Sequence, residues 1–235
     1  MAKTDVSARK RIPVNTESTA AASSHALFFI IVRFAVYTGG ILTLTACLPA
    51  AVGSAGPEIF RENGPVEFIQ LGLLACAIVF FVMVAMRCRH FREFAIFCAA
   101  LCGFVIFREL DALLDDMIPV IGWKIGYLVL LFGATVVFRG RSRFLLQLRQ
   151  FVQLRAFAVL WAAFIIAVPF AQLVGHGAFL EAFMGADYTG NYKRIIEEVG
   201  ELVGYLVIVM GALETFLQLR SSADHSDRSA PISAS

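Results

Sequence analysis

The sequence predicts an all-α polytopic membrane protein, built as a bundle of six transmembrane helices. Hydrophobic residues make up 59% of the 235 residues and charged residues only 16%, whereas soluble domains are about 45–50% apolar and about 25% charged. Six apolar stretches follow one another along the chain, and each has roughly the 20 residues that a hydrocarbon layer of about 30 Å requires. Lys and Arg are also distributed unevenly between the segments that connect these stretches.

Polar segments enclose the apolar part of the chain. Residues 1–25 are basic and rich in Ser, Ala and Thr, and residues 221–235 are similarly polar. Such segments contain too little apolar surface to form a packed core. We therefore expect disordered cytoplasmic tails at residues 1–25 and 221–235, and a six-helix transmembrane domain at residues 26–220.

Each apolar stretch predicts one membrane helix, because inside lipid every backbone group must be paired within its own segment. Pro169 lies inside the fifth stretch and should disturb that helix, since proline has no backbone N–H. The expected helices cover residues 27–49, 66–86, 93–113, 121–138, 156–175 and 195–217.

The connection over residues 139–155, between the fourth and fifth helices, has an amphipathic pattern. Its Arg and Gln residues fall largely on one side of a helix. The apolar residues that share the other side at helical spacing are Phe144, Leu145, Leu148, Phe151 and Val152. This pattern predicts an amphipathic helix lying in the headgroup layer. An equal alternative is that the fourth or fifth helix simply continues through this segment.

The basic residues predict the orientation of the chain. If the N-terminus is cytoplasmic, 14 of the 20 Lys and Arg residues lie on the inner side, five lie on the outer side, and Arg33 lies within the first helix. This is a strong positive-inside bias. We expect a protein of a bacterial inner (cytoplasmic) membrane, surrounded by lipid, with both termini in the cytoplasm. The sequence has no basic stripe of the kind that nucleic acid requires.

Two of the expected helices cannot cross a bilayer without including charged residues. The uncharged run 94–107 has 14 residues, and at 1.5 Å per residue it covers only about 21 Å. The uncharged run 202–213 has 12 residues and covers about 18 Å. To span, the third helix must take in Arg108 and Glu109, and the sixth must take in Glu201. A charge that faces lipid at this depth is costly, so these groups should face the bundle interior.

Counting along the other helices places further polar groups in the same outer layer. If the third helix is continuous, Arg108, Asp111 and Asp115 share one face at i, i+3 and i+7. The predicted buried polar cluster consists of Glu67, Gln70, Arg108, Glu109, Asp111, Asp115, Gln172, His176, Glu197, Glu198, Glu201 and Tyr205. Buried ionisable residues in membrane helices mark candidate functional sites.

The first interpretation of this cluster is a structural network in an assembly or scaffold protein without chemistry of its own. Arg108 could pair with Glu201 or Glu197, and Lys124 with Asp115 or Asp116. Buried charges are tolerated when they are paired and hydrogen-bonded.

Two alternatives involve an activity, and the sequence leaves open whether the protein is an enzyme. One is a metal-dependent enzyme that acts on a lipid or lipid-linked substrate at the outer leaflet. Carboxylates bind divalent cations such as Mg²⁺, Ca²⁺ or Mn²⁺, and the candidate ligands are Glu67, Glu109, Asp111, Glu197 and Glu201. The other is a transporter coupled to protons or cations. Six helices are few for a carrier, which makes a homo-oligomer a candidate assembly.

Two motifs carry a resemblance to a known group of proteins. They are Arg108-Glu109-Leu110-Asp111 followed by Asp115, and Glu197-Glu198-x-x-Glu201 leading to Gly204-Tyr205. This pattern resembles small uncharacterised multi-pass inner-membrane proteins of bacteria. The resemblance covers the third and sixth helices, implies a membrane fold and implies no activity.

Overall fold

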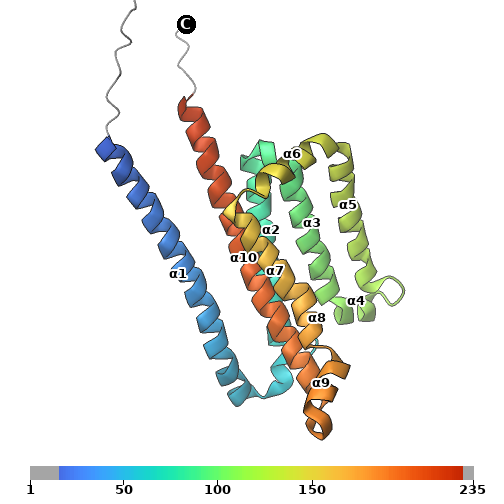
Figure 1. Ribbon diagram of the computed structural model, residues 1–235. Helices are drawn as coiled ribbons and strands as arrows, with labels where there is room; N and C mark the ends of the chain where they lie inside the picture. The colour runs from blue at the N-terminus through green and yellow to red at the C-terminus, as the bar shows by residue number, and fades with distance from the viewer. Residues whose placement is uncertain (1–15, 230–235) are drawn as a thin grey trace, which may run out of the picture. The chain divides into compact units, whose positions relative to one another are not determined.

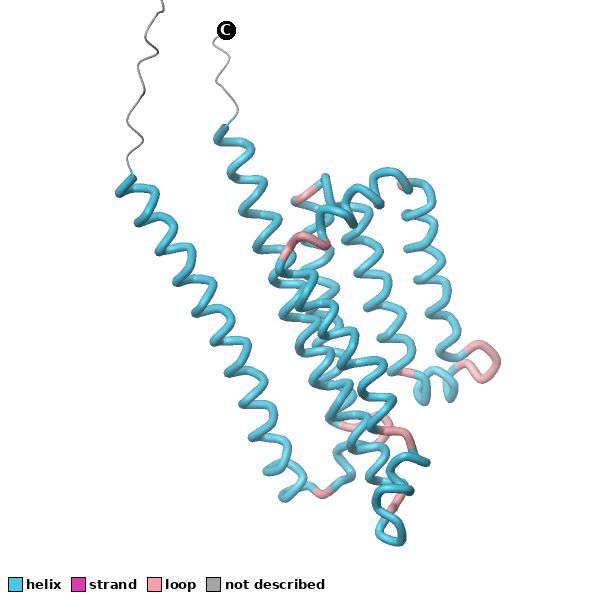
Figure 2. The backbone as a smooth tube through the Cα atoms, in the orientation of Figure 1, coloured by secondary structure: helices cyan, strands magenta, loops and turns pink. Residues whose placement is uncertain are grey.

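A computed structural model describes residues 16–229 of the chain, with side chains described for residues 27–221. Within this range every regular element is a helix, and the helices are joined by short loops (Figure 2). The prediction of an all-α protein is therefore confirmed for the described residues.

The helices are numbered in chain order (Figure 1). The α-helices are α1 Thr16–Ala55, α2 Pro65–Arg87, α3 Arg92–Glu109, α4 Asp111–Met117, α5 Gly126–Arg139, α6 Arg141–Phe151, α7 Arg155–Ile165, α8 Ala171–Val174, α9 Gly177–Met184 and α10 Gly190–Ser229. Short 3₁₀ turns cover Pro57–Phe60, Arg89–Phe91, Gly122–Ile125 and Gly185–Asp187, and a π-helical turn, η4, covers Ile166–Phe170.

Six helical segments in the described part of the chain are long and apolar enough to cross a membrane. They cover Leu27–Ala55, Pro65–Arg87, Arg89–Glu109, Gly122–Arg139, Arg155–Val174 and Gly190–Ser221. These segments coincide with the six stretches expected from the sequence, so their number and order are confirmed. Membrane insertion and the side on which each terminus lies stay predictions.

The segments predicted as tails contain helix at their inner ends. Helix α1 already begins at Thr16, and α10 continues to Ser229. Residues 1–15 and 230–235 lie outside the described part of the chain. The domain boundaries at residues 26 and 220 stay predictions.

The third expected helix is divided into two. Helix α3 ends at Glu109, and Leu110, with φ −86° and ψ 19°, separates it from the short helix α4. The expectation of one continuous helix over residues 93–113 is therefore wrong. Because of this break, side chains beyond Leu110 do not continue the face that Arg108 presents.

The described part of the chain divides into two compact units, one that ends at Ala46 and one that begins at Cys47. In the second unit, α5 packs on α3, α3 on α2, α2 on α10, and α10 on α7. In the most apolar 18-residue stretch of α10, 61% of the residues are buried, against at most 28% in the corresponding stretches of α2, α3, α5 and α7. Helix α10 is therefore the central helix of this unit.

Small residues allow the helices around α10 to approach closely. A Cβ atom on Gly204 would stand 2.6 Å from Cα of Ala167 in η4, and one on Gly200 would stand 3.0 Å from Cβ of Ala171 in α8. The spacing Gly200-x-x-x-Gly204 matches the small-residue motif of packed membrane helices. A glycine also allows α5 to pack closely on α3, where a Cβ on Gly133 would lie 2.8 Å from Cβ of Ala100.

Pro169 interrupts the fifth expected helix, as its sequence position predicts. It lies inside the π-helical turn η4, which separates α7 from α8. Because proline cannot donate a backbone hydrogen bond, a wider turn accommodates it within the helix. The turn places Ala167 against the backbone of Gly204.

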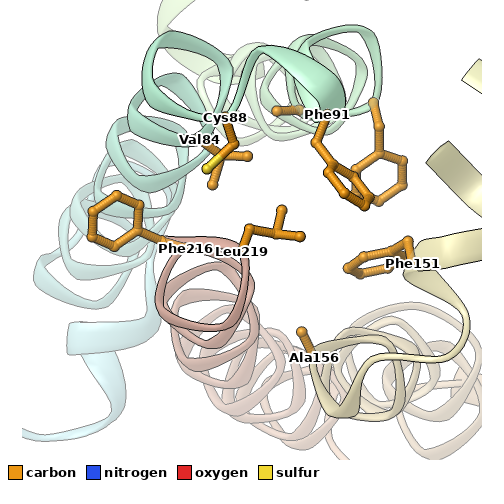
Figure 3. Packing of buried hydrophobic residues seen from close by; sticks show 9 residues of the cluster. Val84, Cys88, Phe91, Phe151, Ala156, Phe216 and Leu219 are labelled. Carbon is orange, nitrogen blue, oxygen red and sulfur yellow. The ribbon is translucent and has the colours of Figure 1, made fainter. Parts of the chain in front are cut away.

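The segment between the fourth and fifth spans forms a separate helix, α6, so it is not a continuation of either neighbour. Its side toward the core carries Phe151, which is 3% exposed, and the partly buried Phe144 and Leu148. Phe151 belongs to an apolar cluster with residues of α2, α7 and α10 (Figure 3). Leu145 and Val152, expected on the same face, are exposed instead. The placement of α6 in a headgroup layer stays a prediction.

Candidate functional site

Four polar side chains of α10 are bonded to side chains of three other helices near one end of the second unit. We call the bonded set the α10 network. Its members are Gln70 of α2, Arg108 and Glu109 of α3, Gln172 of α8, and Glu197, Glu198, Glu201 and Tyr205 of α10.

An ion pair joins α3 to α10. Nη2 of Arg108 donates to Oε1 of Glu201 over 3.1 Å. The Glu201 side chain is 4% exposed, whereas that of Arg108 is 45% exposed. The carboxylate is thus buried beside its counter-ion, and the guanidinium reaches the surface. The sequence offered Glu201 and Glu197 as partners for Arg108, and the structure selects Glu201.

A second bond between α3 and α10 lies one helical turn further along. The buried Tyr205 hydroxyl donates to Oε1 of Glu109 over 2.8 Å. Arg108 and Glu109 are neighbours at the end of α3, and Glu201 and Tyr205 are four residues apart on α10. The two bonds therefore fasten the last turn of α3 to two consecutive turns of α10.

Helix α2 joins the network through an amide. Gln70 is fully buried, and its Nε2 donates to Oε2 of Glu198 over 2.9 Å and to the Glu198 main-chain oxygen over 3.2 Å. Its Oε1 has no hydrogen-bond partner among the described residues. Glu67, one turn earlier on α2, is also buried and accepts the main-chain N–H of Asn63 over 2.5 Å. Glu67 thus lies beside the network, but its hydrogen bond is local to the start of α2.

The segment that follows the π turn supplies the remaining contact. Nε2 of Gln172 donates to Oε1 of Glu197 over 2.9 Å. Helix α8 can approach α10 here because Gly175 has no side chain, and a Cβ at that position would stand 3.0 Å from Cβ of Glu197. Gln172 is exposed and Glu197 is half-buried, so this bond lies at the edge of the network.

Nine of the twelve predicted cluster residues lie in the α10 network or, in the case of Glu67, beside it. The other three, Asp111, Asp115 and His176, have exposed side chains. Asp111 accepts the N–H of Ala112 over 2.6 Å, and Asp115 lies against Gly122, where a Cβ atom would stand 1.6 Å from its Oδ1. The break at Leu110 explains why the two aspartates leave the face of Arg108.

Lys124 does not take the place that the sequence suggested for it. It is exposed, and no ion pair within residues 27–221 joins it to Asp115 or Asp116. Arg108 is therefore the base that the structure brings to the carboxylates of the α10 network.

A metal-binding arrangement was the basis of one alternative interpretation. Across the described residues, no three His, Cys, Asp or Glu side chains are grouped in a way that could hold a metal ion. What the site presents is a set of carboxylates, each of which accepts a hydrogen bond from a different donor.

Buried polar residues at the opposite end of the unit were not anticipated from the sequence. Glu214 directly follows the uncharged run 202–213 of the sixth expected helix, yet it is fully buried and accepts a bond from Gln218 over 2.8 Å. A signal existed, because Val207, Met210 and Glu214 follow one another at i, i+3 and i+7 and so share a face. Gln147 of α6 is 2% exposed and was placed among the polar residues of an interfacial helix.

Gln147 connects α6 to the start of α3. Its Oε1 accepts the N–H of Phe94 over 2.9 Å, and its Nε2 donates to Oε2 of Glu93 over 2.7 Å. Arg143 of α6 reaches Oε1 of the same carboxylate over 3.1 Å. Both oxygens of Glu93 are therefore engaged by α6.

Comparisons of the chain with models of protein families, with curated protein sequences and with solved structures gave no match.

Proposed function

We propose that the chain is a multi-pass protein of a bacterial inner membrane, with both termini in the cytoplasm, and that it serves as a structural or scaffold component. In this proposal the α10 network fixes how the membrane helices pair. The six apolar helices and the positive-inside distribution of Lys and Arg support the location and the orientation.

One observation carries the structural role. Each of Glu197, Glu198 and Glu201 accepts a bond from a different helix, and Tyr205 donates to a carboxylate of α3. A polar group in an apolar surrounding is costly unless it is hydrogen-bonded, so these groups favour the one arrangement in which all of them are paired. The network therefore acts on the specificity of helix packing.

A double-mutant cycle on the ion pair tests this role. We expect Arg108→Ala to lower the free energy of unfolding by roughly 1–3 kcal/mol, because it leaves a buried carboxylate without its counter-ion. The double variant Arg108→Ala/Glu201→Gln should lose about 0.5–2 kcal/mol less than the sum of the single losses. Unfolding of the full chain from mild detergent into sodium dodecyl sulfate provides the measurement.

The chain supplies a matched control for this cycle. Arg61 and Glu58 form an i, i+3 ion pair at 3.3 Å, and both side chains are about two-thirds exposed. Their coupling should stay below about 0.5 kcal/mol, as is usual for surface pairs. Equal coupling in the two cycles would contradict a structural role for the buried pair. So would a stoichiometric divalent metal in the purified protein that is lost in Glu201→Gln.

A further inference from the structure

A basic cavity lies at the end of the second unit where α3 begins and α5 ends. It has a volume of about 590 Å³ and is lined by four arginines: Arg89, Arg92, Arg139 and Arg143. They come from the turn before α3, the first residue of α3, the last residue of α5 and the first turn of α6. A second hollow, of about 370 Å³, shares Arg89 and Arg143 with it.

The protein neutralises only part of the positive charge of this cavity. Glu93 is the acid in its lining, and both of its carboxylate oxygens already accept bonds from Arg143 and Gln147. Within residues 27–221, no ion pair engages Arg89, Arg92 or Arg139, and all three are exposed. Arg92 is attracted by the neighbouring Glu93 carboxylate but makes no direct ion pair with it, so four guanidinium groups share one carboxylate and the cavity keeps an excess of positive charge.

Helix ends of both polarities also lie around the cavity. Helix α3 begins at Arg92 and α6 begins at Arg141, beside the cavity residues Gly140 and Arg143. The N-terminus of a helix carries a partial positive charge and unpaired N–H groups. Two such ends accompany the arginines, but the N–H of Phe94 in the first turn of α3 is already bonded to Gln147, and the C-terminal end of α5 at Arg139 has the opposite partial charge. The arginine side chains are therefore the main source of attraction for an anion.

One wall of the cavity is apolar. Ile96 of α3 and Phe132 and Val136 of α5 line it, and Phe132 is 60% exposed. These residues belong to the apolar spans Arg89–Glu109 and Gly122–Arg139, and the arginines stand at or near the ends of those spans. A ligand of this cavity thus meets cations at one end and a hydrocarbon-facing wall at the other.

We propose that this cavity binds the headgroup of an anionic phospholipid, with the lipid phosphate held by Arg92 and Arg139 and an acyl chain along Ile96, Phe132 and Val136. Guanidinium groups bind phosphate oxygens through paired N–H donors. Basic pockets between membrane helices are suited to anionic lipid headgroups. The proposal does not depend on the α10 network, and the two are tested with different variants.

Lipid retention by the purified full-length protein tests the site. The protein in mild detergent is titrated with phosphatidylglycerol or with phosphatidylcholine of the same acyl chains, and the bound lipid is counted by native mass spectrometry. We expect phosphatidylglycerol to bind more tightly, because the choline cation is repelled by the arginines. In a competition experiment, inorganic phosphate at the same concentration as the lipid should displace little of it, because free phosphate cannot contact the apolar wall.

Two substitutions and a matched control locate the binding. Arg92→Gln and Arg139→Gln should each weaken binding of phosphatidylglycerol roughly fivefold, in line with the usual contribution of one basic residue at a membrane surface. Arg149→Gln, an exposed change on α6 outside both cavities, should leave it unchanged. The variant Arg92→Lys/Arg139→Lys keeps the charge but loses the paired N–H donors, so it should bind phosphatidylglycerol more weakly than the native chain and more tightly than Arg92→Gln/Arg139→Gln, which separates charge loss from misfolding.

Three results would overturn the proposal. The first is equal binding of the two lipids, and the second is unchanged affinity after Arg92→Gln/Arg139→Gln in a protein that still elutes as a single species. The third is full displacement of the lipid by inorganic phosphate at equal concentration, which would make the cavity a site for a free anion.

Discussion

Arg108 and Glu109, neighbours on α3, reach Glu201 and Tyr205 on α10. In each bond both polar partners are satisfied by one another, and Glu201 and Tyr205 are almost completely buried. Loss of one partner leaves the other unpaired in an apolar surrounding, which is more costly than loss of the pair. At the scale of single residues, these two bonds should therefore dominate the effect of mutations at the polar positions of the α10 network.

The variant Tyr205→Phe removes one hydroxyl and keeps the ring. We expect the free energy of unfolding to fall by about 0.5–1.5 kcal/mol, because the bond to Glu109 is lost while the packing is preserved. The detergent-unfolding assay used for the ion pair measures this loss.

Tyr127 is the matched position for this change. It is 53% exposed and packs its ring against Phe104 and Trp123. Tyr127→Phe should be close to neutral. Equal losses at positions 127 and 205 would show that the hydroxyl of Tyr205 contributes nothing specific.

The pairing of Arg108 with Glu201 was among the pairings predicted from the sequence, and the burial of Gln147 and Glu214 was not. Arg108 and Glu201 both end short uncharged runs, so helix length alone predicts that they lie within the membrane. Gln147 and Glu214 stand next to residues that were expected in the headgroup layer, where polar groups meet no penalty. The burial of Gln147 follows from tertiary packing that the local sequence does not specify, whereas Glu214 shares a helix face with Val207 and Met210.

At the scale of helices, α10 is held against η4 and α8 by glycines without Cβ atoms. Gly204 faces the backbone of Ala167, so its contact cannot be relieved by a change of rotamer. Close backbone approach of this kind supplies the packing contacts that hold membrane helices together. Ala167, which packs against Gly204, belongs to the π turn that contains Pro169.

A methyl group at position 204 tests this contact. The Cβ of Gly204→Ala would lie 2.5 Å from Cβ of Ala167 and 2.8 Å from its backbone nitrogen. We expect a loss of about 1–3 kcal/mol in the free energy of unfolding, the usual cost of overpacking.

Gly72→Ala provides the comparison in α2. Gly72 is exposed, and nothing lies within 4 Å of a Cβ at that position. This change should be neutral or stabilise by up to about 1 kcal/mol, because Ala favours the helix over Gly. If Gly204→Ala behaves in the same way, the close contact between α10 and η4 does not contribute to stability.

Hydropathy predicted which segments form spans, and it was less informative about where helices end. The break at Leu110 has no proline or glycine to announce it, and α10 continues past its apolar part to Ser229. The unpredicted break at Leu110 affected two of the predicted site residues. Asp111 and Asp115 were assigned to a face that exists only in an unbroken helix, and both are exposed.

At the scale of the whole molecule, acidic side chains predominate at one end of the second unit and basic side chains at the other. The α10 network, rich in carboxylates, lies at one end, and the arginine-lined cavity lies at the end where α3 begins. Two apolar clusters, one of them around Phe94 and Phe151 and the other around Leu74 and Phe81, fill the core of the unit. This separation matches the charge bias of the loops on which the predicted orientation rests.

The neighbours of each helix could not be predicted from the sequence. Soluble helices reveal their buried face because the other face is polar. In this chain both faces of a span are apolar, as is expected of a helix that has lipid on one side and protein on the other. The central place of α10 is therefore known from the structure, although its carboxylates already indicated that one face must be shielded from lipid.

The central claim is that the carboxylates of α10 lie inside the helix bundle and not in open water. It is tested most directly by thiol labelling in membrane vesicles, with a cysteine-free full-length chain that carries Gln70→Cys, Glu201→Cys or Asp116→Cys. The native Gln70 and Glu201 are buried and Asp116 is exposed. A membrane-impermeant maleimide should label position 116 quickly, and it should label positions 70 and 201 only after denaturation. Labelling of position 201 as fast as position 116 would contradict the account.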